Sequence, residues 1–272
     1  MSRIQTVFSA LKASSKKALI PYITAGDPHP KHTVNLLHTM VKNGADMIEL
    51  GIPFSDPMAD GPVIQRASER ALKHKVGLKN VLEMVSEFRQ KDDKTPIILM
   101  GYANPIEAMG QAKFTQAAKA AGVDGVLTVD YPPEECSDFI AALQANGMDS
   151  IFLLSPTSDS NRVNLIVNQA SGFLYYVSLK GVTGAANLDV EEVKARVAEI
   201  RSKTSLPIGV GFGVKDSITA KNVAAFADAI VVGSRMVLTI ENSTEDNLLQ
   251  NITQLMQELR TAIDSKWCAR KG

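Results

Sequence analysis

Residues 125–154 read GVLTVDYPPEECSDFIAALQANGMDSIFLL, and this stretch contains the repeat that decides the fold. Its two ends, residues 125–129 and 150–154, are short runs of mostly apolar residues. Between them, residues 134–145 place apolar side chains at helical spacing, and Gly147 follows where a helix is expected to end. Continuously apolar strands that alternate with an amphipathic helix are typical of a parallel sheet covered by helices on both faces.

The same alternation extends along the chain in both directions. Six further apolar runs occupy residues 18–24, 46–50, 96–102, 173–178, 207–210 and 228–232. Segments with helical spacing lie between the runs, for example residues 33–43, 62–73, 80–89, 113–121 and 190–202. Eight strand–helix units favour closure into a (β/α)8, or TIM, barrel over an open doubly wound sheet. We expect extra helices at the two ends of the chain, over residues 3–12 and 247–266.

The composition is that of one folded α/β domain. The 272 residues match the roughly 250 that a single barrel fills, and no linker divides them, so we expect one domain over residues 1–272. Twenty-nine basic and 29 acidic side chains cancel, which argues against a nucleic-acid partner or a polybasic membrane anchor. No apolar run approaches the roughly 18 residues of a membrane helix, and no signal peptide is expected. Cys136 and Cys268 form no C-x-x-C motif, so we expect a reduced, cytoplasmic protein without disulfides.

Glycine-rich loops follow the last predicted strands. Residues 209–213, GVGFG, follow the seventh run, and Gly233-Ser234 follows the eighth. In a barrel, these two loops often bind phosphate through backbone N–H groups and a helix N-terminus, and Thr183-Gly184 is a candidate for a further donor. The alternative is that the glycines only make tight turns. The loops at the opposite end of the strands, KNGAD, AAGVD and ANGMD, are plain by comparison.

Two carboxylates are candidates for acid–base chemistry. Glu49 lies near the end of the apolar run MIEL. Burying an acid in such a strand is costly unless the acid is paired with a cation or takes part in chemistry. Asp60 follows eleven residues later, within reach of the barrel mouth. Two carboxylates in different surroundings can divide acid–base work, because the more buried one has the higher pKa. The alternatives are a salt bridge from Glu49 to a barrel cation, and turn or helix-capping roles for Asp56 and Asp60.

Three tyrosines are candidates for the wall of a binding pocket. Tyr22, Tyr102 and Tyr175 fall in or at the ends of the first, third and sixth strands, where they either pack the barrel or line a pocket for an aromatic ligand. An apolar slot near Leu99 and Leu127 would complete that pocket.

No metal site is expected, because the histidines form no H-E-x-x-H motif. The four histidines are His29, His32, His38 and His74. Lys180 lies in a glycine-rich loop, where side chains are exposed by default.

Residues 49–65, ELGIPFSDPMADGPVIQ, closely resemble the signature of the tryptophan synthase alpha subunit family. Further blocks resemble that family in the same order: PYITAGDP, MGYANP, GVTG, GFGV and GSR. The resemblance extends from about Ile4 to the last helix. Two departures concern Tyr22, where some members carry Phe, and SLKG before GVTG, where many members have an Arg and a small residue.

The resemblance implies a retro-aldol cleavage of indole-3-glycerol phosphate to indole and glyceraldehyde 3-phosphate, without a metal or cofactor in this chain. It assigns Glu49 as the general acid–base and Asp60 as the residue at the indole nitrogen. It places Thr183 in a loop that closes over the site. The phosphate would be held by Gly184, Gly211, Phe212, Gly213, Gly233 and Ser234.

The resemblance also implies a partner, a beta subunit that carries pyridoxal phosphate, takes up the indole through a tunnel and forms an alpha2-beta2 heterotetramer with this chain. Residues 52–62 form a proline-rich loop with apolar Phe54 and Met58, and we expect Pro53 and Asp56 to contact that partner. Otherwise the prolines only stiffen a catalytic loop. Three other functions stay open: a stand-alone indole-releasing lyase, another phosphate-binding barrel such as a sugar-phosphate isomerase, and an inactive regulatory barrel.

Overall fold

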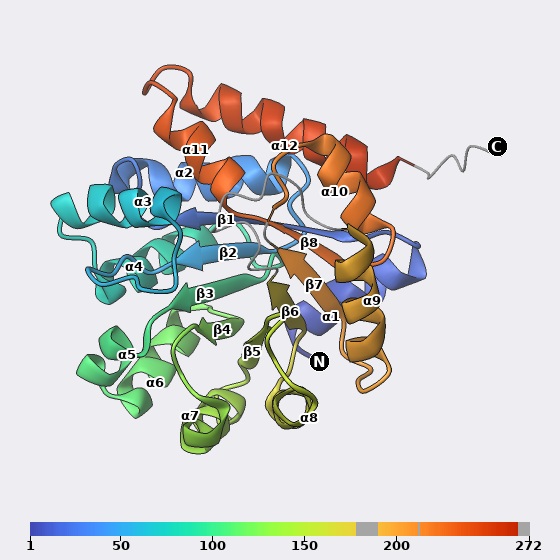
Figure 1. The fold of residues 1–272 in the computed structure, drawn as a ribbon. Coiled ribbons are helices and arrows are strands. Elements are labelled where there is room, and N and C mark those ends of the chain that lie inside the picture. Colours follow the sequence, from blue (N-terminus) through green and yellow to red (C-terminus); the bar gives the residue numbers. More distant parts are fainter. Residues whose placement is uncertain (178–189, 212, 266–272) are drawn as a thin grey trace.

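The computed structural model describes residues 1–177, 190–211 and 213–265, and in these ranges eight parallel strands close into a barrel (Figure 1). The strands are β1 (Ala18–Thr24), β2 (Ile48–Gly51), β3 (Ile97–Gly101), β4 (Gly125–Thr128), β5 (Asp149–Leu154), β6 (Leu174–Val177), β7 (Ile208–Gly211) and β8 (Ala229–Val232). Each strand pairs with the next one in the chain, and β8 pairs with β1 from Ala18↔Ala229 to Pro21↔Val232. The barrel predicted from the sequence is confirmed.

Helices surround the barrel (Figure 1). They are α1 (Arg3–Ala13), α2 (Pro30–Lys42), α3 (Pro62–Lys73), α4 (Leu78–Arg89), α5 (Ala103–Met109), α6 (Gln111–Ala121), the 3-10 turn η1 (Pro133–Glu135), α7 (Ser137–Ala145), α8 (Ser160–Gln169), α9 (Val190–Arg201), α10 (Ser217–Ala224), α11 (Ser234–Glu241) and α12 (Leu248–Asp264). The expected start of α2 at residue 33 is wrong, because His29 caps the helix and Pro30 takes its first position. The start expected at residue 134 is also wrong, since η1 precedes α7.

Alternate residues of the strands fill two separate cores. One core lies between the strands and the helices and includes Leu19, Leu50 and Leu99. The other fills the barrel interior with side chains such as Ile98 and Ile151. Because both faces of the strands are buried, the runs are mostly apolar rather than alternating. None of the described helices is long and apolar enough to cross a membrane.

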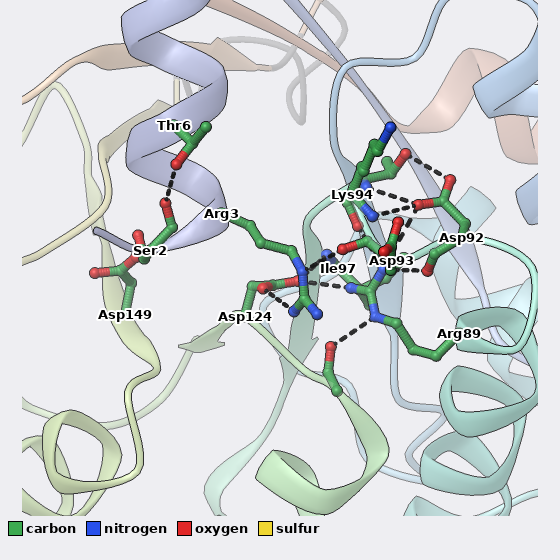
Figure 2. A network of polar contacts seen from close by, with 12 residues as sticks. Ser2, Arg3, Thr6, Arg89, Asp92, Asp93, Lys94, Ile97, Asp124 and Asp149 are labelled. Atoms are coloured by element: carbon green, nitrogen blue, oxygen red, sulfur yellow. Dashed lines mark hydrogen bonds and ion pairs between the residues drawn. The ribbon is translucent and has the colours of Figure 1, made fainter.

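Helix α1 packs Ile4 and Phe8 into the interior core of the barrel, and Figure 2 shows polar contacts near the start of this helix. Ser2 Oγ donates a hydrogen bond of 2.7 Å to Oδ2 of Asp149. The guanidinium of Arg3 donates to Oδ1 of Asp124 at 2.8 Å, and Arg89 donates to Oδ2 of the same carboxylate at 2.7 Å. The loops that contain these aspartates therefore have a structural role, although their sequences look plain.

Three aspartates at the end where the strands begin share one arrangement. Each precedes an even-numbered strand, accepts the backbone N–H near the start of the previous strand, and pairs with an arginine. Asp46 accepts hydrogen bonds from the Leu19 N–H (2.8 Å) and from Arg260 (2.9 Å). Asp124 accepts them from the Ile97 N–H (2.9 Å) and from Arg89 (2.7 Å). Asp228 accepts them from the Ile208 N–H (2.9 Å) and from Arg201 (2.7 Å). These bonds satisfy strand N–H groups that the barrel ladder leaves free. They stabilise one end of the barrel and leave the other for chemistry.

Candidate active site

A cavity of about 890 Å³ opens at the carboxyl ends of the strands. This volume lies within the range of roughly 300–1,000 Å³ that is usual for small-molecule sites. The wall combines two acids, several aromatic rings, glycine-rich loops and three cations. Its members include Glu49 and Asp60; Tyr22, Tyr131, Phe152 and Tyr175; Gly213, Gly233 and Ser234; and Arg162, Lys215 and Arg235.

Glu49 lies in β2, opposite Tyr22 of β1 and Ile98 of β3 in the barrel register. Its side chain is only 2% exposed. No hydrogen bond or ion pair joins its carboxyl group to another side chain in the described part of the chain, so the salt-bridge alternative is wrong there. Burial raises the pKa of Glu49 to about 8, and the nearby Asp60 acts in the same direction. A carboxyl group with such a pKa holds a proton near neutral pH and can still release it, as a general acid–base requires.

Asp60 lies in the loop between β2 and α3. Tyr102 donates a hydrogen bond of 3.0 Å to its Oδ2, and Gln65 Nε2 donates to its backbone carbonyl at 2.9 Å. Burial raises the pKa of Asp60, while the bond from Tyr102 lowers it. The predicted capping alternative is wrong for Asp60, because Gly61 is the N-cap of α3 and no side chain caps that helix.

Two tyrosines beside Glu49 each lie across a glycine of the neighbouring strand. A Cβ atom added to Gly51 would lie 2.2 Å from the hydroxyl oxygen of Tyr22, and one added to Gly211 would lie 2.2 Å from that of Tyr175. Both rings are 7% exposed and line the cavity. Burial raises both tyrosine pKa values, so the hydroxyls stay neutral. The structure thus gives Gly51 and Gly211 a packing role that the sequence motifs do not reveal.

The predicted apolar slot is partly wrong. Leu99 belongs to the outer core, whereas Met100, the next residue of β3, lines the cavity. Leu127 belongs to the inner core and Tyr102 packs behind the Asp60 loop, so neither is among the lining residues. The ring of Tyr102 stacks on Phe54 with centroids 5.2 Å apart.

Tyr131 and Phe152 line the cavity but were not predicted. Tyr131 follows β4 in the DYPP loop, and Phe152 lies in β5. A signal for Tyr131 was available, because loops after barrel strands carry the site. The sequence carries no such signal for Phe152, since its neighbours in the strand, residues 151–154, are all apolar.

Helix α11 presents an open N-terminus at the other side of the cavity. It begins at Ser234 after the N-cap Gly233, and no side chain caps it, whereas Asp159 caps α8 and Asp216 caps α10. Its first helical hydrogen bond runs from Val237 N–H to the Gly233 carbonyl, so earlier N–H groups have no helical acceptor. Such an end attracts anions.

Other residues expected at the phosphate differ in their placement. Gly213 lines the cavity in a left-handed conformation with φ +77°, which favours glycine. Gly211 lies in β7 under the ring of Tyr175 and is not among the lining residues. Thr183, Gly184 and Phe212 lie outside the described residues, as does Lys180.

Charges in the cavity wall are separated. The acids Glu49 and Asp60 come from β2 and its loop, whereas the cations follow later strands. Arg162 lies on α8, Lys215 follows β7, and Arg235 lies in the first turn of α11. The cavity therefore has an acidic side with aromatic walls and a basic side at the N-terminus of α11.

The histidines lie away from this cavity. His29 caps α2 by accepting a bond from the Lys31 N–H, and its ring lies 4.3 Å from that of His74. The His32 ring approaches Glu245, and His38 packs on Phe88. No group of three or more His, Cys, Asp or Glu side chains within the described ranges is arranged to hold a metal ion. Cys136 is buried and forms no disulfide within the described residues, and Cys268 lies outside them.

The loop between β2 and α3 also forms part of the outer surface. Asp56 is exposed and Met58 is 84% exposed. They line a shallow hollow of about 330 Å³ together with Phe54, Ser55, Pro57, Gln65, Glu69 and Leu72. Pro53, in contrast, is buried within the chain, so it offers little surface to a partner.

Comparisons with known proteins agree on one family. A family model described as tryptophan synthase alpha chain matches residues 8–264. A tryptophan synthase alpha chain from Chromobacterium violaceum is 60% identical over 263 residues, which cover 97% of this chain and 100% of that protein. The crystal structure of tryptophan synthase subunit alpha from Legionella pneumophila aligns with a TM-score of 0.92 and 48% identity, covering 97% and 99% of the two chains. A tryptophan synthase chain from M. tuberculosis, in an aminoacrylate-bound form, aligns with a TM-score of 0.87 and 31% identity, covering 97% and 100%.

Proposed function

The chain belongs to the tryptophan synthase alpha chain family, and from this premise we propose that Glu49 and Asp60 catalyse the retro-aldol cleavage of indole-3-glycerol phosphate. The products are indole and glyceraldehyde 3-phosphate, and the activity is that of a lyase. The observation that carries the assignment is the buried Glu49, which no side chain in the described part of the chain binds, in one cavity wall with Asp60. Burial raises the pKa of Glu49 to about 8.

Glu49 moves two protons in this mechanism. In its protonated form it donates a proton to C3 of the indole ring, which leaves a positive charge on the ring nitrogen. The resulting carboxylate then accepts the proton of the adjacent glycerol hydroxyl as the carbon–carbon bond breaks. The bonding electrons return to the ring, so indole and the aldehyde leave while Glu49 regains its proton. One group can serve both steps because its pKa of about 8 lies close to neutral pH.

Asp60 stabilises the charge that develops on the ring. Its carboxylate accepts a hydrogen bond from the indole N–H. This interaction becomes more favourable as positive charge develops on the nitrogen. This role requires the ionised form, and the bond from Tyr102 supports it by lowering the pKa of Asp60 against the effect of burial. Tyr22, Tyr175 and Met100 supply the apolar walls for the flat ring.

The phosphate group binds on the basic side of the cavity. The N-terminus of α11 at Ser234 and the backbone at Gly213 and Gly233 are suited to hold it, and Arg235 adds charge. The family resemblance also implies Gly184 and Phe212, which lie outside the described residues, and Gly211, which is not among the residues that line the cavity. Thr183, which the family resemblance also implies, lies outside the described residues.

The indole passes to a beta subunit, which carries the pyridoxal phosphate, whereas this chain works without a cofactor. We place the pair in an alpha2-beta2 heterotetramer in the cytoplasm. The loop that carries Asp60 offers exposed Asp56 and Met58 to that partner. A contact at Asp56 would also fix Asp60, since both lie in one loop.

The assay that tests this function measures indole release from indole-3-glycerol phosphate by the wild-type chain and by Glu49→Gln, each with and without a beta subunit. We expect the variant to lose activity by about 10²–10⁴-fold, because the amide cannot exchange protons. Near-normal turnover in a soluble Glu49→Gln variant contradicts the assignment. In the same assay, equal stimulation of wild type and Asp56→Ala by the beta subunit removes Asp56 from the contact.

A further inference from the structure

Arg70 on α3 joins two carboxylates that come from opposite ends of the sequence. Its Nε donates to Oδ1 of Asp27 at 2.6 Å and its Nη2 donates to Oδ2 of Asp27 at 2.9 Å. Its remaining Nη1 donates to Oε1 of Glu241 on α11 at 2.7 Å. Arg66, one turn earlier on α3, binds both oxygens of Glu241 at 2.8 Å. We call these four residues the Arg70 network.

The network is anchored in the protein interior. The Asp27 side chain is fully buried in the loop after β1, and Arg70 is 23% exposed. Arginine is well suited to this place, because its planar group can bind one carboxylate with two parallel bonds and still reach a second carboxylate. A lysine ammonium at the same position is a point charge and cannot reproduce that geometry.

The two helices that the network joins carry the two ends of the proposed substrate site. Helix α3 begins two residues after Asp60, and α11 begins at Ser234. Both helices pack on β1 and on each other. Near the cavity they meet through a small apolar cluster of Tyr22, Ala67 and Val237. Further along the same helices, the Arg70 network joins them a second time.

We propose that Arg70 is a positioning residue that sets the separation between the indole end of the site at Asp60 and the phosphate end at Ser234. The proposal rests on the proposed function. The substrate must reach both ends at once, so a shift of α3 against α11 misplaces its reacting atoms relative to Glu49. A displacement of about 1 Å in such a geometry can lower the rate by about 10²-fold. A ligand that occupies one end alone does not depend on the separation.

Arg70→Lys tests the proposal, with Arg66→Lys as the matched control. Arg66 is on the same helix and binds Glu241, but it does not touch Asp27 and is 45% exposed. The measurements are kcat and KM for indole-3-glycerol phosphate in the presence of a beta subunit, and the dissociation constants of glycerol 3-phosphate and of indole by calorimetry. We expect Arg70→Lys to lower kcat/KM by about 10-fold to 10²-fold. Both single-end ligands should bind as they do to wild type. Arg66→Lys keeps the bonds of Arg70 to Asp27 and Glu241, so it should lower kcat/KM much less than Arg70→Lys does.

Two results overturn the proposal. In one, kcat/KM of Arg70→Lys equals that of wild type. In the other, glycerol 3-phosphate or indole loses as much affinity as the substrate loses in kcat/KM, which indicates local collapse rather than a changed separation. If Arg70→Lys does not fold, Glu241→Gln takes its place, because it keeps the side-chain shape and removes the charge between the two arginines. Wild-type turnover and its loss in Glu49→Gln test the proposed function separately, so either idea can fail alone.

Discussion

The hydroxyl group of Tyr102 donates a hydrogen bond of 3.0 Å to Oδ2 of Asp60 and accepts one of 3.0 Å from the N–H of Ala59. One side chain from the end of β3 thus holds both the carboxylate and the backbone of the loop after β2. The stacking of Phe54 on the Tyr102 ring adds an apolar contact to the same loop. If Asp60 has the proposed role, Tyr102 acts on the reaction by holding Asp60, without a contact to the substrate.

Replacing Tyr102 with Phe is expected to shift the acid side of the pH–rate profile upward. The bond from Tyr102 lowers the pKa of Asp60, so its loss raises that pKa. Asp60 then becomes protonated at a higher pH on acidification, and activity that needs the carboxylate is lost earlier. The measurement is kcat for indole release as a function of pH. Phe54→Leu is the control, because it removes the stacked ring and keeps the hydrogen bond. Lower activity in Tyr102→Phe at every pH, without a shift of the acid limb, would contradict this role.

We expect Glu49 to lower the free energy of unfolding at high pH. We expect Glu49→Gln to remove this pH dependence. The folded-state pKa of about 8 lies above the ordinary value of 4.5 for a glutamate, so the folded chain retains a proton that the unfolded chain loses. The stabilising contribution is complete below pH about 4.5 and is lost as the pH rises through about 8. Relative to wild type, Glu49→Gln should therefore gain stability between pH 5 and pH 9.

Urea unfolding of both proteins at these two pH values measures that difference. The exposed Glu83→Gln on α4 serves as the control for the loss of one carboxylate. A stability difference between wild type and Glu49→Gln that does not change with pH would mean that Glu49 is ionised in the folded chain. The general-acid step would then lack its proton.

Much of the fold was predictable because a barrel repeats one local pattern. Each strand is buried on both faces, so every run is apolar and visible without knowledge of its partners. The helices without a predicted segment, α5, α8, α10 and α11, have 7, 10, 8 and 8 residues. So few turns leave little helical periodicity to detect.

The site was predictable where its residues lie close in sequence and not where they meet only in space. Glu49 and Asp60 share one motif, and the structure places both in the wall of one cavity. The prediction that Leu99 of β3 faces the cavity was wrong. When both faces of a strand are apolar, the sequence does not reveal which residues point inward. The contact between Arg70 and Asp27 spans 43 residues, and no local pattern announces it.

Gly51→Ala is expected to destabilise the chain and to impair the site. The added Cβ would lie 2.2 Å from the Tyr22 hydroxyl oxygen and 2.7 Å from the adjacent ring carbon, so the ring of Tyr22 must move. Overpacking of this kind typically costs about 1–3 kcal/mol. Gly77→Ala is the control, because no atom lies within 4 Å of its added Cβ. The measurements are the free energy of unfolding and the KM for indole-3-glycerol phosphate. Equal stability of the two variants would show that Tyr22 has room to move.

Asp124→Ala is expected to lower stability and leave the chemistry intact. The Asp124 carboxylate is 4% exposed and accepts bonds from Arg3, Arg89 and the Ile97 N–H (Figure 2). Its removal leaves the Arg89 guanidinium, 11% exposed, without this partner, and breaking a buried pair from one side costs about 3–5 kcal/mol.

Asp93→Ala is the matched control for this prediction, because only the backbone carbonyl of Asp93 accepts a bond from Arg3. Urea unfolding should separate the two variants, whereas kcat below the melting transition should equal that of wild type in both. The reason is spatial: Asp124 lies where the strands begin, and Glu49 acts where they end. A fall in kcat for folded Asp124→Ala would mean that the two ends of the barrel are coupled through the strands.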